Sequence, residues 1–202
     1  MTFYRSSPGN YRGFCRVCGS PIVSKFDAHP DYDWRAHERT LNQFDHYRVS
    51  VGDVELHYVL EQGEGPSPRP LLLTHGWPGS FYEYHTLIPL LTKPSQFGGR
   101  VDDAFTVVVP SMPGHGLSFR SNQPRFGIKE IADGIKVLMV DVLAYPAFAA
   151  HGHDWGAFVA TRLAYAHAEG LHEQVAALGC PCSVEGQQPC LMTTTRSRHF
   201  AM

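Results

Sequence analysis

A single aspartate in a glycine-rich turn has the surroundings that most favour chemistry. Asp154 lies between Gly152 and Gly156, after the short apolar segment 147–150 and before the helix-like segment 157–165. A strand that turns sharply into a helix between small residues holds its middle residue at a strained backbone angle, exposed at the edge of a sheet. Because a carboxylate is ionised at neutral pH, it can attack a carbon centre without a base. We therefore interpret Asp154 as a nucleophile that forms an alkyl ester, which water cleaves afterwards.

A second loop supplies groups that such a nucleophile needs. Residues 75–78, His-Gly-Trp-Pro, follow an apolar run that is typical of a buried strand. Ester cleavage develops negative charge on the attacked carboxyl oxygen, and backbone N–H groups at the carboxyl edge of a sheet stabilise that charge. We expect the N–H groups of Trp77 and Trp155 to form this oxyanion hole. The structural alternatives are a plain turn at 75–78 and a role for Asp154 as the N-cap of the following helix.

The middle of the chain alternates between strand and helix patterns. The expected elements are a hairpin over residues 46–60, buried strands over 70–74 and 104–109, and helices over 81–91 and 128–143. This alternation predicts an α/β fold with a largely parallel sheet. The turn at 113–118 is interpreted as structural support for the site. From about residue 178 the chain shows neither pattern, and we expect no further strand after the helix that follows Asp154.

Composition excludes several classes of protein. The chain has 202 residues, of which 43% are hydrophobic, and a formal net charge of −2. This balance gives no broad attraction to nucleic acid or to an anionic membrane. No apolar run approaches the roughly 18 residues of a membrane span, and the N-terminus lacks a signal pattern. Five unevenly spaced cysteines fit a reducing compartment, so a cytoplasmic protein is expected, and its oligomeric state is left open.

Three motifs, in this order along the chain, resemble the epoxide hydrolases of the α/β-hydrolase superfamily. They are residues 72–80, 109–118 and 152–156, and the preceding residues 31–58 are similar to the N-terminal region of the microsomal-type branch. The resemblance implies that Asp154 attacks an epoxide carbon. It also implies the Trp77 and Trp155 oxyanion hole, a small apolar epoxide and water as substrates, and no cofactor. A haloalkane dehalogenase is the nearest enzymatic alternative, although that family usually has a polar halide-binding residue where Trp77 stands.

The resemblance also implies groups that this chain does not match. In the family, lid tyrosines protonate the epoxide oxygen, and a downstream histidine with an acidic partner activates water. We therefore expect an incomplete α/β-hydrolase fold, without lid or C-terminal strands, in a truncated or frameshifted chain that forms the ester and stalls. The expected divisions are a cysteine segment at 1–30, an epoxide-hydrolase N-terminal region at 31–69, a core at 70–177 and an irregular tail at 178–202.

The N-terminal segment has chemistry of its own. Cys15 and Cys18, followed by Gly19, form a Cys-x-x-Cys turn whose two thiolates could reach one zinc ion. Their surroundings resemble the closing zinc-site segment of the glutathione-dependent formaldehyde-activating enzymes, a family in which a second cysteine pair lies upstream. The favoured interpretation is an orphan fragment with two free thiols. A small zinc-binding module and a non-functional gene fragment are therefore alternatives to an enzyme.

Overall fold

The computed structural model describes residues 2–14, 16–17, 21–26, 34–119, 122–167 and 171–177. Within these ranges the chain divides into two compact units, residues 1–39 and residues 40–202. The strands are β1 (Thr2–Ser7), β2 (Asn10–Phe14), β3 (Pro21–Phe26), β4 (His46–Val51), β5 (Val54–Glu61), β6 (Arg69–Thr74), β7 (Phe105–Pro110), β8 (Phe148–His153) and β9 (Leu171–Ala177). The helices are α1 (Trp34–Leu41), α2 (Leu87–Thr92), α3 (Ile128–Lys136) and α4 (Trp155–Ala166), with 3-10 turns η1 (Phe81–Tyr84), η2 (Pro94–Phe97), η3 (Val101–Asp103) and η4 (Gly116–Ser118) and the π-helical segment η5 (Val137–Val142).

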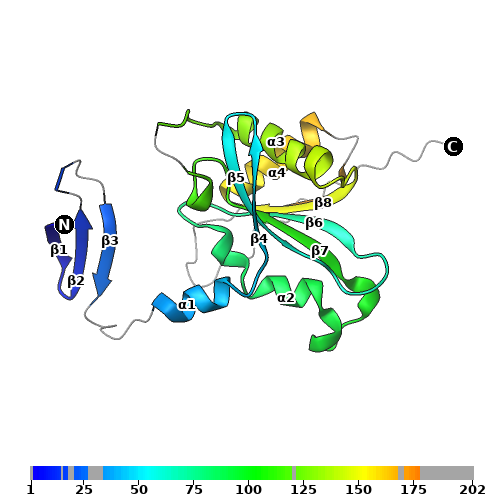
Figure 1. The fold of residues 1–202 in the computed structure, drawn as a ribbon, viewed down its shortest axis with the longest axis horizontal. Helices are drawn as coiled ribbons and strands as arrows, with labels where there is room; N and C mark the ends of the chain where they lie inside the picture. Colours follow the sequence, from blue (N-terminus) through cyan, green and yellow to red (C-terminus); the bar gives the residue numbers. More distant parts are fainter. Residues whose placement is uncertain are drawn as a thin grey trace, which may run out of the picture. The chain divides into compact units, whose positions relative to one another are not determined.

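The larger unit contains a mixed sheet with the strand order β4-β5-β7-β6-β8-β9 (Figure 1). The hairpin β4–β5 is antiparallel, and β5 is antiparallel to β7. From β7 onward every neighbouring pair is parallel, through β6 and β8 to β9. The carboxyl ends of β6 and β8 therefore meet at one edge of the sheet, where the loop after β6 and the turn after β8 emerge.

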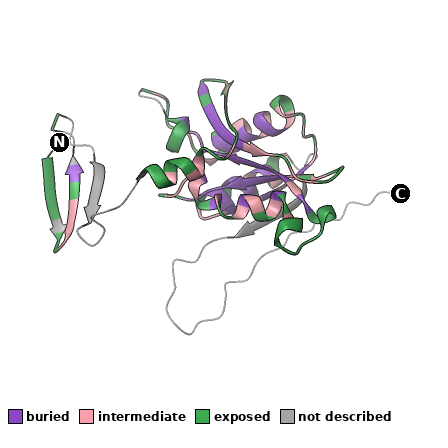
Figure 2. Cartoon of the chain, turned by 60° about the horizontal axis from the view of Figure 1, so that its bottom comes forward, coloured by how far each residue is buried: buried purple, intermediate pink, exposed green. Residues whose placement is uncertain are grey.

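Helices cover both faces of this sheet, as Figure 1 shows. On one face α3, η5 and α4 pack against alternate residues of the strands, and the fully buried members of this cluster include Leu72, Ile135, Leu138 and Leu163. On the other face η1 and α2 pack against a smaller cluster. The central strands lie almost wholly in the buried class (Figure 2). Their continuous apolar runs follow from this two-sided burial.

The smaller unit contains an antiparallel sheet, β1-β2-β3. Among its described side chains, Phe3 is 52% exposed and Tyr4 is 65% exposed. The described aromatic side chains of β1 are therefore largely open to solvent.

The α/β class, the hairpin, the two buried strands and the helix that follows Asp154 are confirmed. One expectation is wrong, and two expected helices are present in altered form. A strand, β9, does follow α4 and pairs with β8, although polar residues interrupt its apolar pattern. The expected helix over 81–91 divides into η1 and α2, because the ring of Pro89 would clash with the carbonyl of His85 in a continuous helix. The helix expected over 128–143 changes at Val137 from an α-helix to a π-helix.

Candidate active site

Asp154 occupies the turn between β8 and α4 with a strained backbone. Its φ of 51° and ψ of −124° lie outside the regions that non-glycine residues usually adopt. Such strain persists only where the surrounding structure fixes it, and it concentrates at functional sites. The expected sharp turn is therefore present, with Asp154 at its apex.

The two flanking glycines allow this turn to pack against β6. A Cβ atom on Gly152 would overlap the carbonyl oxygen of Gly156, and a Cβ atom on Gly156 would overlap the carbonyl oxygen of Thr74. The buried Thr74 hydroxyl donates hydrogen bonds to the carbonyl oxygens of Gly156, at 3.0 Å, and His151, at 3.2 Å. The end of β6 and the turn thus form one close-packed unit, and the role of Thr74 in it was not predicted.

The loop after β6 brings a backbone donor to the aspartate. The Trp77 N–H donates to Oδ1 of Asp154 at 2.9 Å. This bond is the largest cause of a pKa of the Asp154 carboxyl below its ordinary value. The Trp155 N–H and the charge of His153 lower the same pKa by smaller amounts. Asp154 stands at the N-cap position of α4, but its side chain makes no capping hydrogen bond. The capping alternative is therefore not supported.

A buried histidine holds this loop. Nε2 of His75 accepts from the Met112 N–H at 3.1 Å, so the other ring nitrogen, Nδ1, donates to the Gly76 carbonyl at 2.9 Å. Burial lowers the pKa of His75, which favours this neutral form. His75 therefore ties the loop after β6 to the loop after β7.

The loop after β7 is anchored in turn by β5. The Ser118 hydroxyl accepts from the His57 N–H, and Nδ1 of His57 lies 2.9 Å from the Ser111 hydroxyl. Both serines are buried. These contacts support the interpretation of residues 113–118 as structural support for the site.

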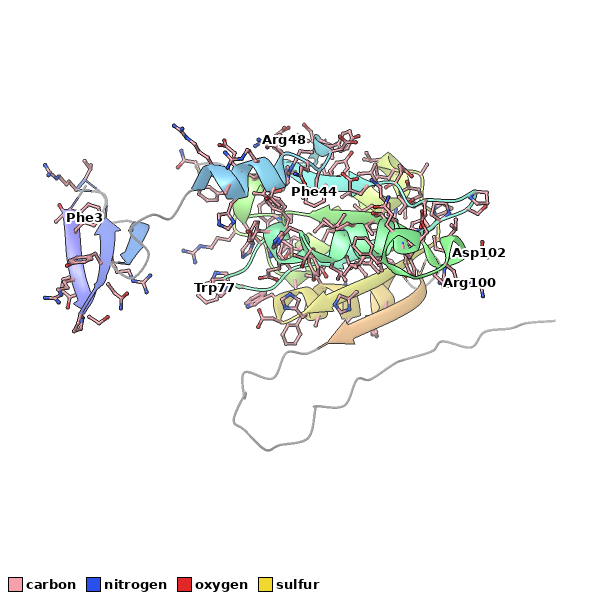
Figure 3. The ribbon with its side chains drawn as sticks, turned by 90° about the horizontal axis from the view of Figure 1, so that it is seen from below. Phe3, Phe44, Arg48, Trp77, Arg100 and Asp102 are labelled. Carbon is pink, nitrogen blue, oxygen red and sulfur yellow. The ribbon has the colours of Figure 1, made fainter. Side chains whose placement is uncertain are left out.

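Large apolar side chains on the two segments that meet at Asp154 are open to solvent. The Trp77 side chain is 64% exposed at the rim of the sheet (Figure 3), Trp155 is 45% exposed and Phe158, on α4, is 50% exposed. Exposed aromatic side chains therefore occur both on the loop after β6 and on the first turn of α4.

The two predicted zinc ligands, Cys15 and Cys18, lie outside the described residues. Among the residues that the structure does describe, no group of three or more histidine, cysteine, aspartate or glutamate side chains could hold a metal ion.

The family of the chain is evident from comparison with known proteins. The model of the alpha/beta hydrolase fold matches residues 69–199, and the model of the epoxide hydrolase N terminus matches residues 8–84. The chain belongs to the α/β-hydrolase fold family. The N-terminal match begins upstream of Cys15 and thus includes the segment for which a zinc fragment is predicted.

Relatives and solved structures confirm the resemblance to epoxide hydrolases. Epoxide hydrolase 1 of Oryctolagus cuniculus is 35% identical over 153 residues, which are 72% of this chain and 33% of that protein. The juvenile hormone epoxide hydrolase of the silkworm Bombyx mori superposes with a TM-score of 0.64 at 29% identity, over 72% of this chain and 38% of that one. An Aspergillus niger epoxide hydrolase gives a TM-score of 0.62 at 26% identity, over 79% and 41%. The chain spans about a third of the length of relatives such as the rabbit enzyme.

Among the described helices, none is long and apolar enough to cross a membrane.

Proposed function

We propose that this chain opens epoxides through Asp154, by the first half of an epoxide hydrolase reaction. The observation that carries the proposal is the hydrogen bond from the Trp77 N–H to Oδ1 of Asp154, at 2.9 Å, on a strained turn. It leaves Oδ2 as the oxygen that attacks an epoxide carbon. The carbon–Oδ2 bond forms, the epoxide carbon–oxygen bond breaks, and the released alkoxide takes up a proton from an acid or from water. This step needs no cofactor.

The same donors serve the second half of the reaction. Water attacks Cγ of the alkyl ester, its proton passes to a base, and the bond from Cγ to the alkylated oxygen breaks to release a diol and the free carboxylate. In this proposal the negative charge develops on Oδ1, to which the Trp77 N–H donates, and the neighbouring Trp155 N–H is the second donor. Relatives named as epoxide hydrolases, and the exposed aromatic rings on the two segments that meet at Asp154, support an apolar epoxide as the substrate. Zinc binding by Cys15 and Cys18 stays a separate prediction.

Mass spectrometry of the 202-residue chain tests this proposal. We expect incubation with styrene oxide to add one epoxide mass per chain, on Asp154, and Asp154→Ala to abolish the adduct. Asp102→Ala, which removes an exposed carboxylate from η3, is the matched control and retains the adduct. Persistence of the adduct in Asp154→Ala would contradict the assignment. If ester cleavage needs a base outside this chain, the adduct accumulates instead of turning over, as the sequence resemblance implies.

A further inference from the structure

A histidine and a glutamate pair directly beside the proposed nucleophile. Nε2 of His153, the last residue of β8, lies 2.6 Å from Oε2 of Glu83 in η1. The two side chains are 36% and 34% exposed, so the pair is half-buried. The pair joins the segment that contains Asp154 to the segment that follows Trp77.

The glutamate folds back over the loop that it follows. A Cβ atom on Gly79 would overlap the Glu83 carboxylate, so that carboxylate lies against the loop backbone. The Ser80 hydroxyl accepts from the Tyr82 N–H at the start of η1, and the Tyr84 hydroxyl donates to the Thr74 carbonyl at 2.8 Å. These bonds fix η1 to the end of β6, so the position of Glu83 is coupled to that of the loop.

The loop, in turn, touches both members of the nucleophile segment. A Cβ atom on Gly76 would lie 3.1 Å from Oδ1 of Asp154 and 3.2 Å from Cε1 of His153. Gly76 immediately precedes the Trp77 N–H that bonds Asp154. A small shift of the loop relative to β8 therefore changes the hydrogen bond on the carboxylate.

We propose that the Glu83–His153 pair is a positioning pair, which holds the Trp77 N–H on Oδ1 of Asp154 by tying η1 to the end of β8. The inference rests on the proposed function, in which that N–H belongs to the oxyanion hole. Surface ion pairs contribute little in general, because solvent screens them and both side chains lose freedom. This pair differs because it is short and half-buried, and because it links the two segments that meet at Asp154. Other titratable groups that face it are His75, just after β6, Tyr84 of η1, and Asp154 itself.

Alkylation kinetics give the first test. We expect Glu83→Gln and His153→Gln each to slow the reaction of the full chain with styrene oxide by about tenfold, as loss of an orienting contact does. The double variant should be no slower than the His153→Gln variant, since either change removes the whole interaction. Asp102→Asn is the matched control, because it breaks an exposed ion pair at the opposite end of this unit from Trp77 (Figure 3), and it should react at the original rate.

A titration that uses no epoxide gives the second test. In ¹³C NMR, the Asp154 carboxyl should titrate at higher pH in Glu83→Gln, because its bond from Trp77 weakens. Removal of a nearby negative charge by itself lowers a carboxyl pKa, so an upward change cannot come from the lost Glu83 charge and reports a lost contact on Asp154. If the Asp154 pKa in Glu83→Gln is unchanged or lower, the inference is overturned, even if alkylation of that variant is slower. If the Asp154 pKa rises in Glu83→Gln but the unsubstituted chain is not alkylated by styrene oxide, the positioning pair is supported and the proposed function is contradicted.

Discussion

At the scale of single residues, backbone N–H groups from two separate segments hold the Asp154 carboxylate. Its Oδ1 accepts from the Trp77 N–H at 2.9 Å, and the Trp155 N–H also contributes to its lowered pKa. Backbone donors are fixed by the fold, so they need little reorganisation when charge develops during a reaction. The site therefore depends on how closely the turn after β8 approaches the end of β6, and glycines set that approach.

Gly156→Ala tests this dependence. We expect the substitution to lower the free energy of unfolding by about 3 kcal/mol and to weaken reaction at Asp154, because the added methyl group overlaps the Thr74 carbonyl oxygen. Gly134→Ala, within α3, is the matched control. Its Cβ atom would lie 3.9 Å from Cγ1 of Val51, beside a hollow of about 350 Å³, so alanine should stabilise the helix by about 1 kcal/mol. Urea denaturation measures both changes, and equal stability of the two variants would contradict the argument.

At the scale of elements, a chain of polar groups joins β4, β5 and the loop after β7, and its inner members, His57 and Ser111, are buried. Nδ1 of His46 lies 2.9 Å from Nε2 of His57, whose Nδ1 lies 2.9 Å from the Ser111 hydroxyl. Burial, with smaller contributions from His46 and Arg48, lowers the pKa of His57 to about 4. A proton on His57 would be a buried charge next to a second imidazole, which opposes this packing.

Acid should therefore weaken the fold. Because the pKa of His57 is lower in the folded than in the unfolded state, stability is fully present above about pH 6.5 and is lost as the pH falls toward 4. We expect this group to contribute a loss of about 2 kcal/mol between about pH 7 and pH 5. Denaturant titrations at both pH values measure it. In the His57→Gln variant, stability should depend less steeply on pH. The dependence that remains comes from His75, whose pKa burial also lowers. An unchanged pH dependence in this variant would refute the role of His57.

The sequence predicts those parts of the site that local patterns encode. Gly152 and Gly156 around Asp154, and the motif at 75–78 after an apolar run, correctly predict the turn and the loop that contacts it. The Glu83–His153 pair and the His46–His57–Ser111 chain were not predicted, because they join residues whose proximity depends on strand order rather than on periodicity. The strand β9 was missed because polar residues interrupt its apolar pattern at the edge of the described sheet.

At the scale of the whole molecule, burial is distributed unevenly between the two compact units and across the larger sheet. Val107, Val108 and Val109 of β7 are fully buried between the two helical layers. In the edge strand β4, by contrast, most residues are exposed. The described side chains of the three-stranded sheet are mostly exposed as well. Local opening is easiest where few apolar contacts must break, so protection of the backbone should follow this distribution.

Amide hydrogen exchange measures that distribution directly. We expect the amides of β6 and β7 to exchange most slowly, with opening free energies close to that of global unfolding. Amides of β4 should exchange faster, through opening of the hairpin alone, and those of β1 and β2 faster still, because a small sheet with exposed apolar side chains is marginal in water. A low concentration of denaturant should accelerate exchange in β6 and β7 strongly and in β1 and β2 hardly at all, since only global unfolding exposes much surface. Uniformly slow exchange in β1, β4 and β7 would show instead that the described parts unfold as one cooperative body, and that the division at residues 39 and 40 has no energetic counterpart.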